Sequence, residues 1–300
     1  MKRKKFFISL ILALLFLGSG VILWGLVEPY TIDETHHTAA VPGLEEDWEG
    51  ARIAVISDFQ VGMWWDNTHT IRQIVSRITE EEPEVVLILG DFIYHGGMDP
   101  SGRINQTAEL LKPLKEANLL VFGVLGNHDY SVASYQNPRI LEDRARQLTV
   151  ELEELDIQLL QNRSTRLKSP SGQPLYIIGS GSHMARKADP KQALQGVPID
   201  APRLVIMHNP ETFPQFPSSS APLALAGHTH GGQFRLPFLP EWTWVNYFKE
   251  EEIHADGWIQ DYGAPGNQLY VNRGIGFSLL PLRLNCPPEL SWFTLTGRSP

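Results

Sequence analysis

The sequence is poor in cysteine and in positive charge, and it lacks internal repeats. Its single cysteine, Cys286, excludes an intrachain disulfide. No repeat with a period of about 20 to 50 residues is present, so a repeat architecture is not indicated. The formal charge is -9, and it becomes -13 when the four positive charges of residues 2–5 are set aside. Because nucleic acids bind basic surfaces, this acidic body argues against a nucleic-acid partner.

A long apolar stretch without charge lies near the N-terminus. Residues 1–5 form a basic tail, and residues 6–26 are uncharged and rich in Leu, Ile and Phe. At about 1.5 Å per residue, a helix of this length crosses a bilayer. The basic tail predicts a single-pass anchor with the rest of the chain on the extracytoplasmic side. A cleaved signal peptide is the alternative, but the apolar run continues beyond Gly18-Ser19-Gly20 to Leu26.

The remaining chain divides into a connector with a first edge strand at 27–50 and a globular domain at 51–300. From Arg52 onward, short apolar runs alternate with segments of helical spacing. The helical positions are Ile71, Ile74, Val75 and Ile78, and then Leu141, Ala145, Leu148, Leu152 and Leu155. This alternation predicts an α/β fold with a largely parallel sheet, in which ligands bind at the carboxyl ends of the strands.

Five of the apolar runs end at a side chain that can bind a metal. These side chains are Asp58, Asp91, Asn127, His208 and His228. Oxygen and imidazole ligands without a thiolate suit Mn, Fe or Zn in a catalytic site rather than a structural zinc site. With His230 the set is too large for one ion that keeps an open position. It therefore predicts a dinuclear centre that activates water for attack on a phosphate ester.

The stretch Gly126-Asn127-His128-Asp129 adds two candidate catalytic side chains. His128 stands beside the ligand Asn127, and we expect it to protonate a leaving oxygen or to stabilise charge on a phosphoryl group. Asp129 is a candidate to orient the His128 imidazole.

Together these motifs resemble the signature of the calcineurin-like metallophosphoesterase superfamily. The segments Asn272 to Gly276 and Leu280 to Glu289 resemble its bacterial membrane-associated branch. The resemblance implies a four-layer α-β-β-α sandwich and two divalent ions, with Mn²⁺ expected first and Fe, Zn or Mg as alternatives. It also implies hydrolysis of a phosphomonoester or phosphodiester.

The resemblance further implies how the ligands divide between the two ions. One ion is expected on Asp58, Asp91 and His230. Asp91 then bridges to the other ion, which is expected on Asn127, His208 and His228, with His128 as a non-ligand histidine beside them.

Two positions depart from the family pattern. Gln60 stands where the family has histidine, and its neutral carbonyl is a weaker ligand for a transition metal than imidazole. The alternative function is therefore a catalytically degenerate metal-binding scaffold at the membrane surface. The second departure is Gly179-Ser180-Gly181-Ser182, where related sequences often carry an acidic pair after the glycine.

Arginines and aromatic residues near the motifs bear on the substrate. Arg273 and Arg283 are candidates for a phosphate clamp, with salt bridges to the acidic body as the alternative. Aromatic side chains can hold acyl chains or lie at a membrane interface, or they can simply pack within loops. Together with the anchor, the aromatic residues favour a lipid-linked or nucleotide-linked phosphate ester as the substrate. The aromatic residues near the motifs lie in Met63-Trp64-Trp65 and at Trp242, Trp244, Tyr247, Phe248, Trp258 and Tyr262.

Overall fold

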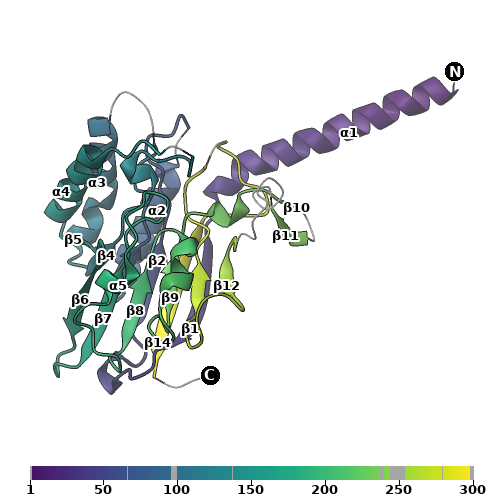
Figure 1. The fold of residues 1–300 in the computed structure, drawn as a ribbon. Coiled ribbons are helices and arrows are strands. Elements are labelled where there is room, and N and C mark those ends of the chain that lie inside the picture. Colours follow the sequence, from purple (N-terminus) through teal and green to yellow (C-terminus); the bar gives the residue numbers. More distant parts are fainter. Residues whose placement is uncertain are drawn as a thin grey trace.

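The computed structural model of the chain describes residues 2–65, 67–95, 100–136, 138–236, 239–243, 254–278 and 280–297. Two six-stranded sheets face each other in it, and a long helix, α1, projects from the body (Figure 1). The sequence-based positions Trp244, Tyr247 and Phe248 lie outside the described residues.

The first sheet has the strand order β1-β14-β2-β3-β4-β5. Strands β2 to β5 run parallel, β14 is antiparallel to β2, and β1 is parallel to β14 at the edge. Their bounds are Asp33–Ala40 for β1, Arg52–Ile56 for β2, Val85–Ile88 for β3, Val121–Gly123 for β4, Ile157–Leu159 for β5 and Glu289–Thr296 for β14. Segment 27–50 thus contains an edge strand.

The second sheet has the order β12-β13-β9-β8-β7-β6. Strands β7, β8, β9 and β13 run parallel, with β6 and β12 antiparallel at the two edges. Their bounds are Arg163–Lys168 for β6, Pro174–Gly179 for β7, Arg203–Ile206 for β8, Ala224–Ala226 for β9, Gly257–Ile259 for β12 and Leu269–Val271 for β13. A separate hairpin pairs β10, Arg235–Leu236, with β11, Leu239–Thr243.

Three apolar layers hold the sandwich together. The outer face of the first sheet packs on α2, Thr68–Glu81, α3, Pro100–Glu116, and α4, Glu142–Glu154. The inner faces of the two sheets form the middle layer. The outer face of the second sheet is covered by α5, Pro190–Ala193, and by the 3₁₀ helix η4, Pro210–Gln215. The predicted four-layer α-β-β-α arrangement is confirmed, although its outer layer on the second sheet is thin.

The helices follow the expected apolar spacing in part. All four predicted apolar positions of α2, Ile71, Ile74, Val75 and Ile78, are buried. In α4 the buried positions Ala145, Leu148 and Leu152 keep the same spacing. Sequence reasoning did not predict α3, because Pro113 lies inside it and an interior proline normally argues against a helix.

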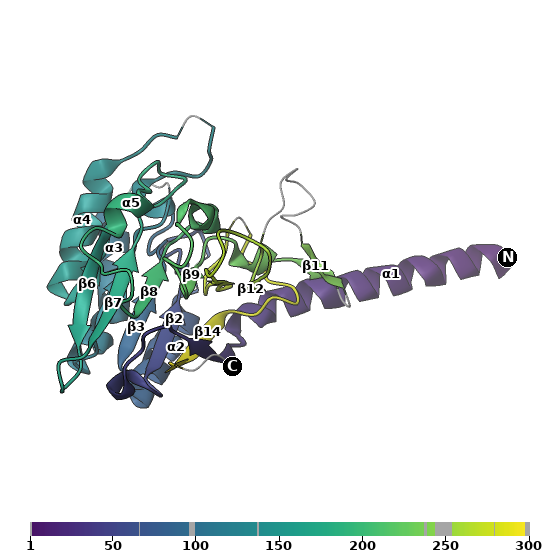
Figure 2. The ribbon, with the colours of Figure 1, turned by 60° about the horizontal axis from the view of Figure 1, so that its bottom comes forward.

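Helix α1, Lys2–Val27, is the one helix of the described chain that is long and apolar enough to cross a membrane. Its N-terminal part projects away from the sandwich in both views, while its C-terminal end joins the body (Figure 2). A 3₁₀ helix, η1, Glu28–Tyr30, follows it directly and leads into β1. The remaining short 3₁₀ helices are η2, Glu46–Trp48, η3, His128–Tyr130, and η5, His230–Gly232.

Candidate metal centre

The predicted ligands meet where strands of both sheets end. Asp58, Asp91 and Asn127 follow β2, β3 and β4 of the first sheet, while His208 and His228 follow β8 and β9 of the second. Main-chain bonds tie the loops together, because Asp58 N donates to Gly90 O at 3.0 Å and Gln60 N donates to Asp91 O at 3.0 Å. The two sheets therefore converge on one buried polar cluster.

Several of these residues have backbone conformations that side chains rarely adopt. The dihedral φ is +55° at Asp58, +53° at Gln60, +54° at Asp91, +75° at His228 and +50° at His230. A left-handed backbone at a residue other than glycine costs about 1–3 kcal/mol and concentrates at functional sites. In this protein the strained conformation occurs at five residues of one cluster.

Asp91 lies at the centre of one half of the cluster. Its Oδ2 is 3.2 Å from His208 Nε2, and that nitrogen is also 3.1 Å from Asn127 Oδ1. Ligand atoms of Asp91, His208 and His228 all lie within 4.8 Å of one another. His208 Nδ1 contacts the Leu89 carbonyl at 2.8 Å, so its proton is on Nδ1 and Nε2 faces the cluster as a potential ligand.

The other half of the cluster contains Asp58, Gln60 and His230, and it meets the first half at Asp91. His230 Nε2 is 3.6 Å from Asp58 Oδ1, and Gln60 Nε2 donates to Asp91 Oδ2 at 2.7 Å. Asp58 Oδ2 accepts from Ser57 Oγ at 2.5 Å and from His228 N at 3.0 Å. These bonds leave Asp58 Oδ1 directed at the cluster.

The donor set fits a metal, because buried ligand atoms lack other partners. Among the described residues, Asp58 Oδ1 and Gln60 Oε1 are buried without a hydrogen-bond partner, and His230 Nε2 lies 3.6 Å from the first of them. A buried acceptor without a partner costs free energy unless a cation or proton satisfies it. Two oxygens and an imidazole nitrogen are also the donor types that divalent transition metals bind.

Glycines stand where the candidate ligands approach the backbone closely. A Cβ atom at Gly126 would lie 2.1 Å from Asp91 Oδ1, and one at Gly227 would lie 2.6 Å from Asp58 Oδ2. Gly90, with φ at +98°, would place a Cβ 2.9 Å from His208 Nδ1. Larger residues at these positions would displace the ligands.

Charge and burial set the protonation of the imidazoles. Burial lowers the pKa of His128 to about 3 and that of His228 to about 4, so both rings are neutral near pH 7. Burial would also lower the pKa of His208, but the neighbouring Asp91 carboxylate raises it to about 10. A metal at this position would replace that proton, as metals generally do when they bind protein ligands.

His128 lies at the edge of the cluster, and a second histidine holds it. Its Nδ1 accepts from the backbone N–H of His95 at 3.1 Å and lies 2.6 Å from His95 Nδ1. Tyr94 stacks on the same ring at 5.3 Å. Because Nδ1 is an acceptor, the His128 proton is on Nε2, which is 4.0 Å from Asp91 Oδ2. Sequence reasoning missed His95; its only signal is its position four residues after Asp91.

Asp129 does not contact the His128 ring, in contrast to the expected orienting role. Its Oδ2 accepts from the backbone N–H groups of Asp91 at 3.0 Å and Gly126 at 2.8 Å, and its Oδ1 accepts from Ile93 at 3.1 Å. The carboxylate therefore joins the two loops that carry Asp91 and Asn127. It positions backbone rather than an imidazole.

The two arginines also differ from the expected phosphate clamp. Arg283 is fully buried, and its guanidinium donates to the carbonyls of Arg273, Gly274, Gly276 and Cys286. Arg273 forms ion pairs with Asp33 at 2.5 Å and Glu289 at 3.1 Å, which is the alternative that the sequence left open. Both guanidinium groups are thus engaged within the protein.

The second sequence departure lies beside the centre rather than in it. Ser182 is buried, and its hydroxyl donates to Oδ1 of Asn209 at 2.7 Å. Asn209 is the residue after His208. Gly181 N donates to Asn162 Oδ1 at 2.8 Å. The serine–glycine segment 179–182 therefore supports the His208 loop through neutral hydrogen bonds.

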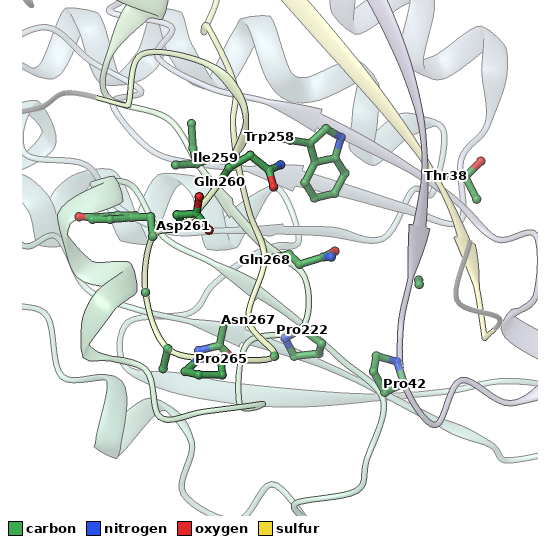
Figure 3. Close-up of a pocket in the computed structure, with 15 residues that line it drawn as sticks. Thr38, Pro42, Pro222, Trp258, Ile259, Gln260, Asp261, Pro265, Asn267 and Gln268 are labelled. Atoms are coloured by element: carbon green, nitrogen blue, oxygen red, sulfur yellow. The ribbon is translucent and has the colours of Figure 1, made fainter.

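A cavity of about 810 Å³ lies at the other end of the sheets (Figure 3). Its wall includes Pro222 and Gln268, which precede β9 and β13, and Thr38 from β1. The candidate ligands instead follow their strands, so this cavity is separate from the centre. Trp258 lines it and packs on Tyr270 at 5.4 Å, while Tyr262 packs on Phe213 at 6.0 Å. Trp258 therefore faces this cavity, while Tyr262 lies between the cavity and η4.

Comparison with known proteins gives consistent matches across the chain. The family model for calcineurin-like phosphoesterases matches residues 51–274. Phosphodiesterase YaeI of Escherichia coli is 31% identical over 216 residues, covering 72% of each chain. Metallophosphoesterase YkuE of Bacillus subtilis is 26% identical over 305 residues, covering 98% of each chain. UDP-2,3-diacylglucosamine pyrophosphatase LpxG of Chlamydia trachomatis is 25% identical over 321 residues, covering 91% of this chain and 93% of that protein.

Proposed function

Because this chain belongs to the calcineurin-like phosphoesterase family and is a phosphate ester hydrolase, we propose that it cleaves a phosphodiester with two divalent ions at the strand ends. Asp58, Gln60 and His230 would hold one ion, and Asn127, His208 and His228 the other. Asp91 would contact both, since it lies within reach of both halves of the cluster.

The observation that carries this proposal is the set of buried ligand atoms without partners. Asp58 Oδ1 and Gln60 Oε1 lack a hydrogen bond among the described residues, His230 Nε2 lies 3.6 Å from Asp58 Oδ1, and a cation is the simplest group that satisfies both oxygens. The mixed oxygen and nitrogen donors favour Mn²⁺, with Fe, Zn or Mg as alternatives. When bound, such ions lower the pKa of water and neutralise phosphoryl charge.

His128 would assist the departure of the leaving oxygen. Its Nδ1 is held as an acceptor by the His95 backbone, so the proton is on Nε2 at the edge of the cluster. A neutral imidazole N–H in that place can donate to a phosphoryl or leaving-group oxygen. His95 and Tyr94 fix the direction in which the proton points.

The substrate we propose is a lipid-linked or nucleotide-linked ester. Support comes from the apolar helix α1 and from two relatives, a phosphodiesterase and a UDP-2,3-diacylglucosamine pyrophosphatase. We further propose that α1 anchors the chain and that the basic residues 2–5 keep the centre on the extracytoplasmic side.

The test is a metal titration of the full chain in detergent. Metal-free protein receives Mn²⁺, Zn²⁺ or Mg²⁺ while nitrophenol release is followed from nitrophenyl phosphate and from bis-nitrophenyl phosphate. We expect metal-dependent turnover that favours the diester and that is lost in Asp91→Asn and His128→Ala. The control is Asp143→Asn, whose side chain is 88% exposed on α4.

The alternative function, a non-catalytic metal-binding scaffold, has one observation in its favour. Gln60 stands at a position where the family carries histidine, and its amide donates an N–H to Asp91 Oδ2. A wild-type protein that binds metal but turns over neither nitrophenyl ester would favour the scaffold. Recovery of turnover in Gln60→His would then locate the defect at this residue.

A further inference from the structure

Helix α1 is joined to the sandwich without a flexible linker. Near its end, Gly25 O accepts from Arg283 N at 3.0 Å. A Cβ atom at Gly25 would lie 3.3 Å from Arg283 O and 3.6 Å from the Leu282 side chain. The last turn of α1 therefore lies directly on the segment 282–286, and we call this contact the junction.

The residues that follow α1 are fixed in the junction from two sides. Glu28 is only 2% exposed, and its carboxylate accepts the backbone N–H of Asn285 at 2.8 Å and that of Cys286. Pro29 O accepts from Asn67 Nδ2 and from Thr70 Oγ1, both at 2.9 Å. A buried carboxylate held by two backbone donors resists displacement, because its removal would leave those donors unpaired.

The junction is also bonded to loops of the metal centre. The Cys286 thiol donates to His230 O at 3.3 Å, and Asn67 Nδ2 donates to Ile275 O at 3.0 Å as well as to Pro29. A Cβ atom at Gly274, the neighbour of Ile275, would lie 2.7 Å from Asp58 Cβ. The base of α1 is thus one layer of residues away from two candidate ligands, Asp58 and His230.

The length of the apolar stretch places the membrane boundary at the junction. Residues 6–26 span about 32 Å as a helix, and the hydrocarbon core of a bilayer is about 30 Å thick. If the stretch crosses the core, its far end falls at Gly25 and Leu26, beside Leu282. The head groups extend about 5–8 Å further, so the loops around the junction would lie among them.

Exposed apolar side chains surround the junction on these loops. They are Trp64, Trp65, Leu236 and Leu280, with exposed fractions of 68%, 51%, 48% and 46%, and we call them the rim. Trp65 stands two positions before Asn67, which bonds Pro29. Leu280 and Leu282 both offer their carbonyls to Gln233 Nε2, and Arg235, next to Leu236, donates its N–H to Leu284 O.

We infer that the partner of the rim is the lipid bilayer itself, and that the rigid junction holds the metal centre at the level of the head groups of that bilayer. Tryptophan prefers the interface between lipid and water, which suits Trp64 and Trp65. The same loop carries Asp58 and Gln60, so a lipid-linked ester would reach the centre without leaving the membrane. Access of a lipid-linked ester to the centre rests on the proposed function, whereas the contact between the rim and the bilayer does not.

Fluorescence quenching tests the contact without any need for turnover. The full chain is reconstituted in phosphatidylcholine vesicles that contain a lipid with a nitroxide on its head group. We expect quenching of tryptophan emission in the wild type to fall by about half in Trp64→Phe/Trp65→Phe and to stay unchanged in the control Trp258→Phe, which alters the distant cavity. Equal quenching in all three proteins would overturn the inference.

An insertion tests whether rigidity of the junction matters. A flexible Gly/Ser segment of about nine residues is placed between Val27 and Glu28, and the control carries it at Gly172, where a Cβ atom would have no neighbour within 4 Å. The probes are soluble bis-nitrophenyl phosphate and the nitrophenyl ester of phosphatidic acid in vesicles. We expect the first insertion to lower only the vesicle rate, by about tenfold, because the centre is no longer held at the surface.

The outcomes separate the two proposals. Unchanged vesicle turnover after the first insertion would contradict the role of the junction while leaving the phosphoesterase intact. If the metal-loaded wild type does not hydrolyse the soluble diester, the proposed function is contradicted. The quenching experiment then still tests whether the rim contacts the bilayer.

Discussion

The Gln60 side chain donates an N–H to Asp91 Oδ2 at 2.7 Å, which fixes the direction of its amide. Because Nε2 is the donor, Oε1 points elsewhere, and it is buried without a partner among the described residues. Gln60 therefore keeps an oxygen available for a metal while its other end holds the carboxylate that both ions would share. If Gln60 is a ligand, its carbonyl would bind the ion more weakly than histidine but would still bind it.

Replacing Gln60 by histidine should strengthen the binding of the ion that Asp58, Gln60 and His230 would hold. Imidazole is a better ligand than a neutral carbonyl for Zn²⁺ or Mn²⁺, so we expect Gln60→His to lower the dissociation constant of one ion by about tenfold. Isothermal titration of the metal-free protein measures this. Gln158→His, at an exposed position of β5, serves as the control. An unchanged constant would mean that residue 60 does not face the metal.

Loss of His95 should affect turnover without affecting metal content. Among the described residues of the centre, His95 bonds to His128 through its backbone N–H and its ring. We expect His95→Ala to lower kcat by about tenfold with KM and bound metal unchanged, whereas His128→Ala should lower kcat by about 10²-fold or more. His95→Asn, which keeps a side-chain donor, should recover part of the rate. A loss of metal in His95→Ala would contradict a positioning role.

Metal should stabilise the fold, because it would satisfy buried atoms. At a concentration about 100 times the dissociation constant, a ligand that binds only the folded state adds about 2.7 kcal/mol to the free energy of unfolding. Thermal unfolding should therefore shift upward with Mn²⁺ and downward with a chelator. Asp91→Asn should lose this shift, whereas Asp143→Asn should keep it. A melting temperature independent of metal in the wild type would contradict the fit of the site.

Arg283 should act on stability rather than on substrate binding. Its guanidinium bonds to four backbone carbonyls and is fully buried. Arg283→Lys would leave several of these acceptors unpaired, so we expect a loss of about 3 kcal/mol in the free energy of unfolding. Denaturant unfolding beside the exposed Arg166→Lys measures it. A stable variant with a raised KM would restore the phosphate-clamp interpretation.

The strand ends of the centre could be predicted from sequence, because each of five candidate ligands follows an apolar run immediately. Positions outside that pattern could not. His95 lies in an irregular segment four residues after Asp91, with no periodicity to mark it. Arg283 and Glu28 are charged residues that composition would place at the surface, yet both are buried on backbone groups distant in sequence. Their roles depend on tertiary contacts that local patterns do not encode.

Asp129 shows a related limit of sequence reasoning. Its place beside His128 predicted a pair of side chains in contact, but the 3₁₀ turn 128–130 directs the two apart. The carboxylate instead accepts from backbone N–H groups at Gly126, Asp91 and Ile93. Adjacency in the chain therefore correctly places Asp129 and His128 in one loop, but it predicts the wrong partner for the Asp129 carboxylate.

The central claim is that turnover depends on two ions that share Asp91, and one titration tests it directly. Metal bound per chain is counted by mass spectrometry while the initial rate on bis-nitrophenyl phosphate is measured in the same samples of full-length protein. We expect the rate to rise as the second ion binds and to saturate at two ions per chain. Two bound ions without turnover of the diester, or full turnover in Asp91→Asn, would contradict it.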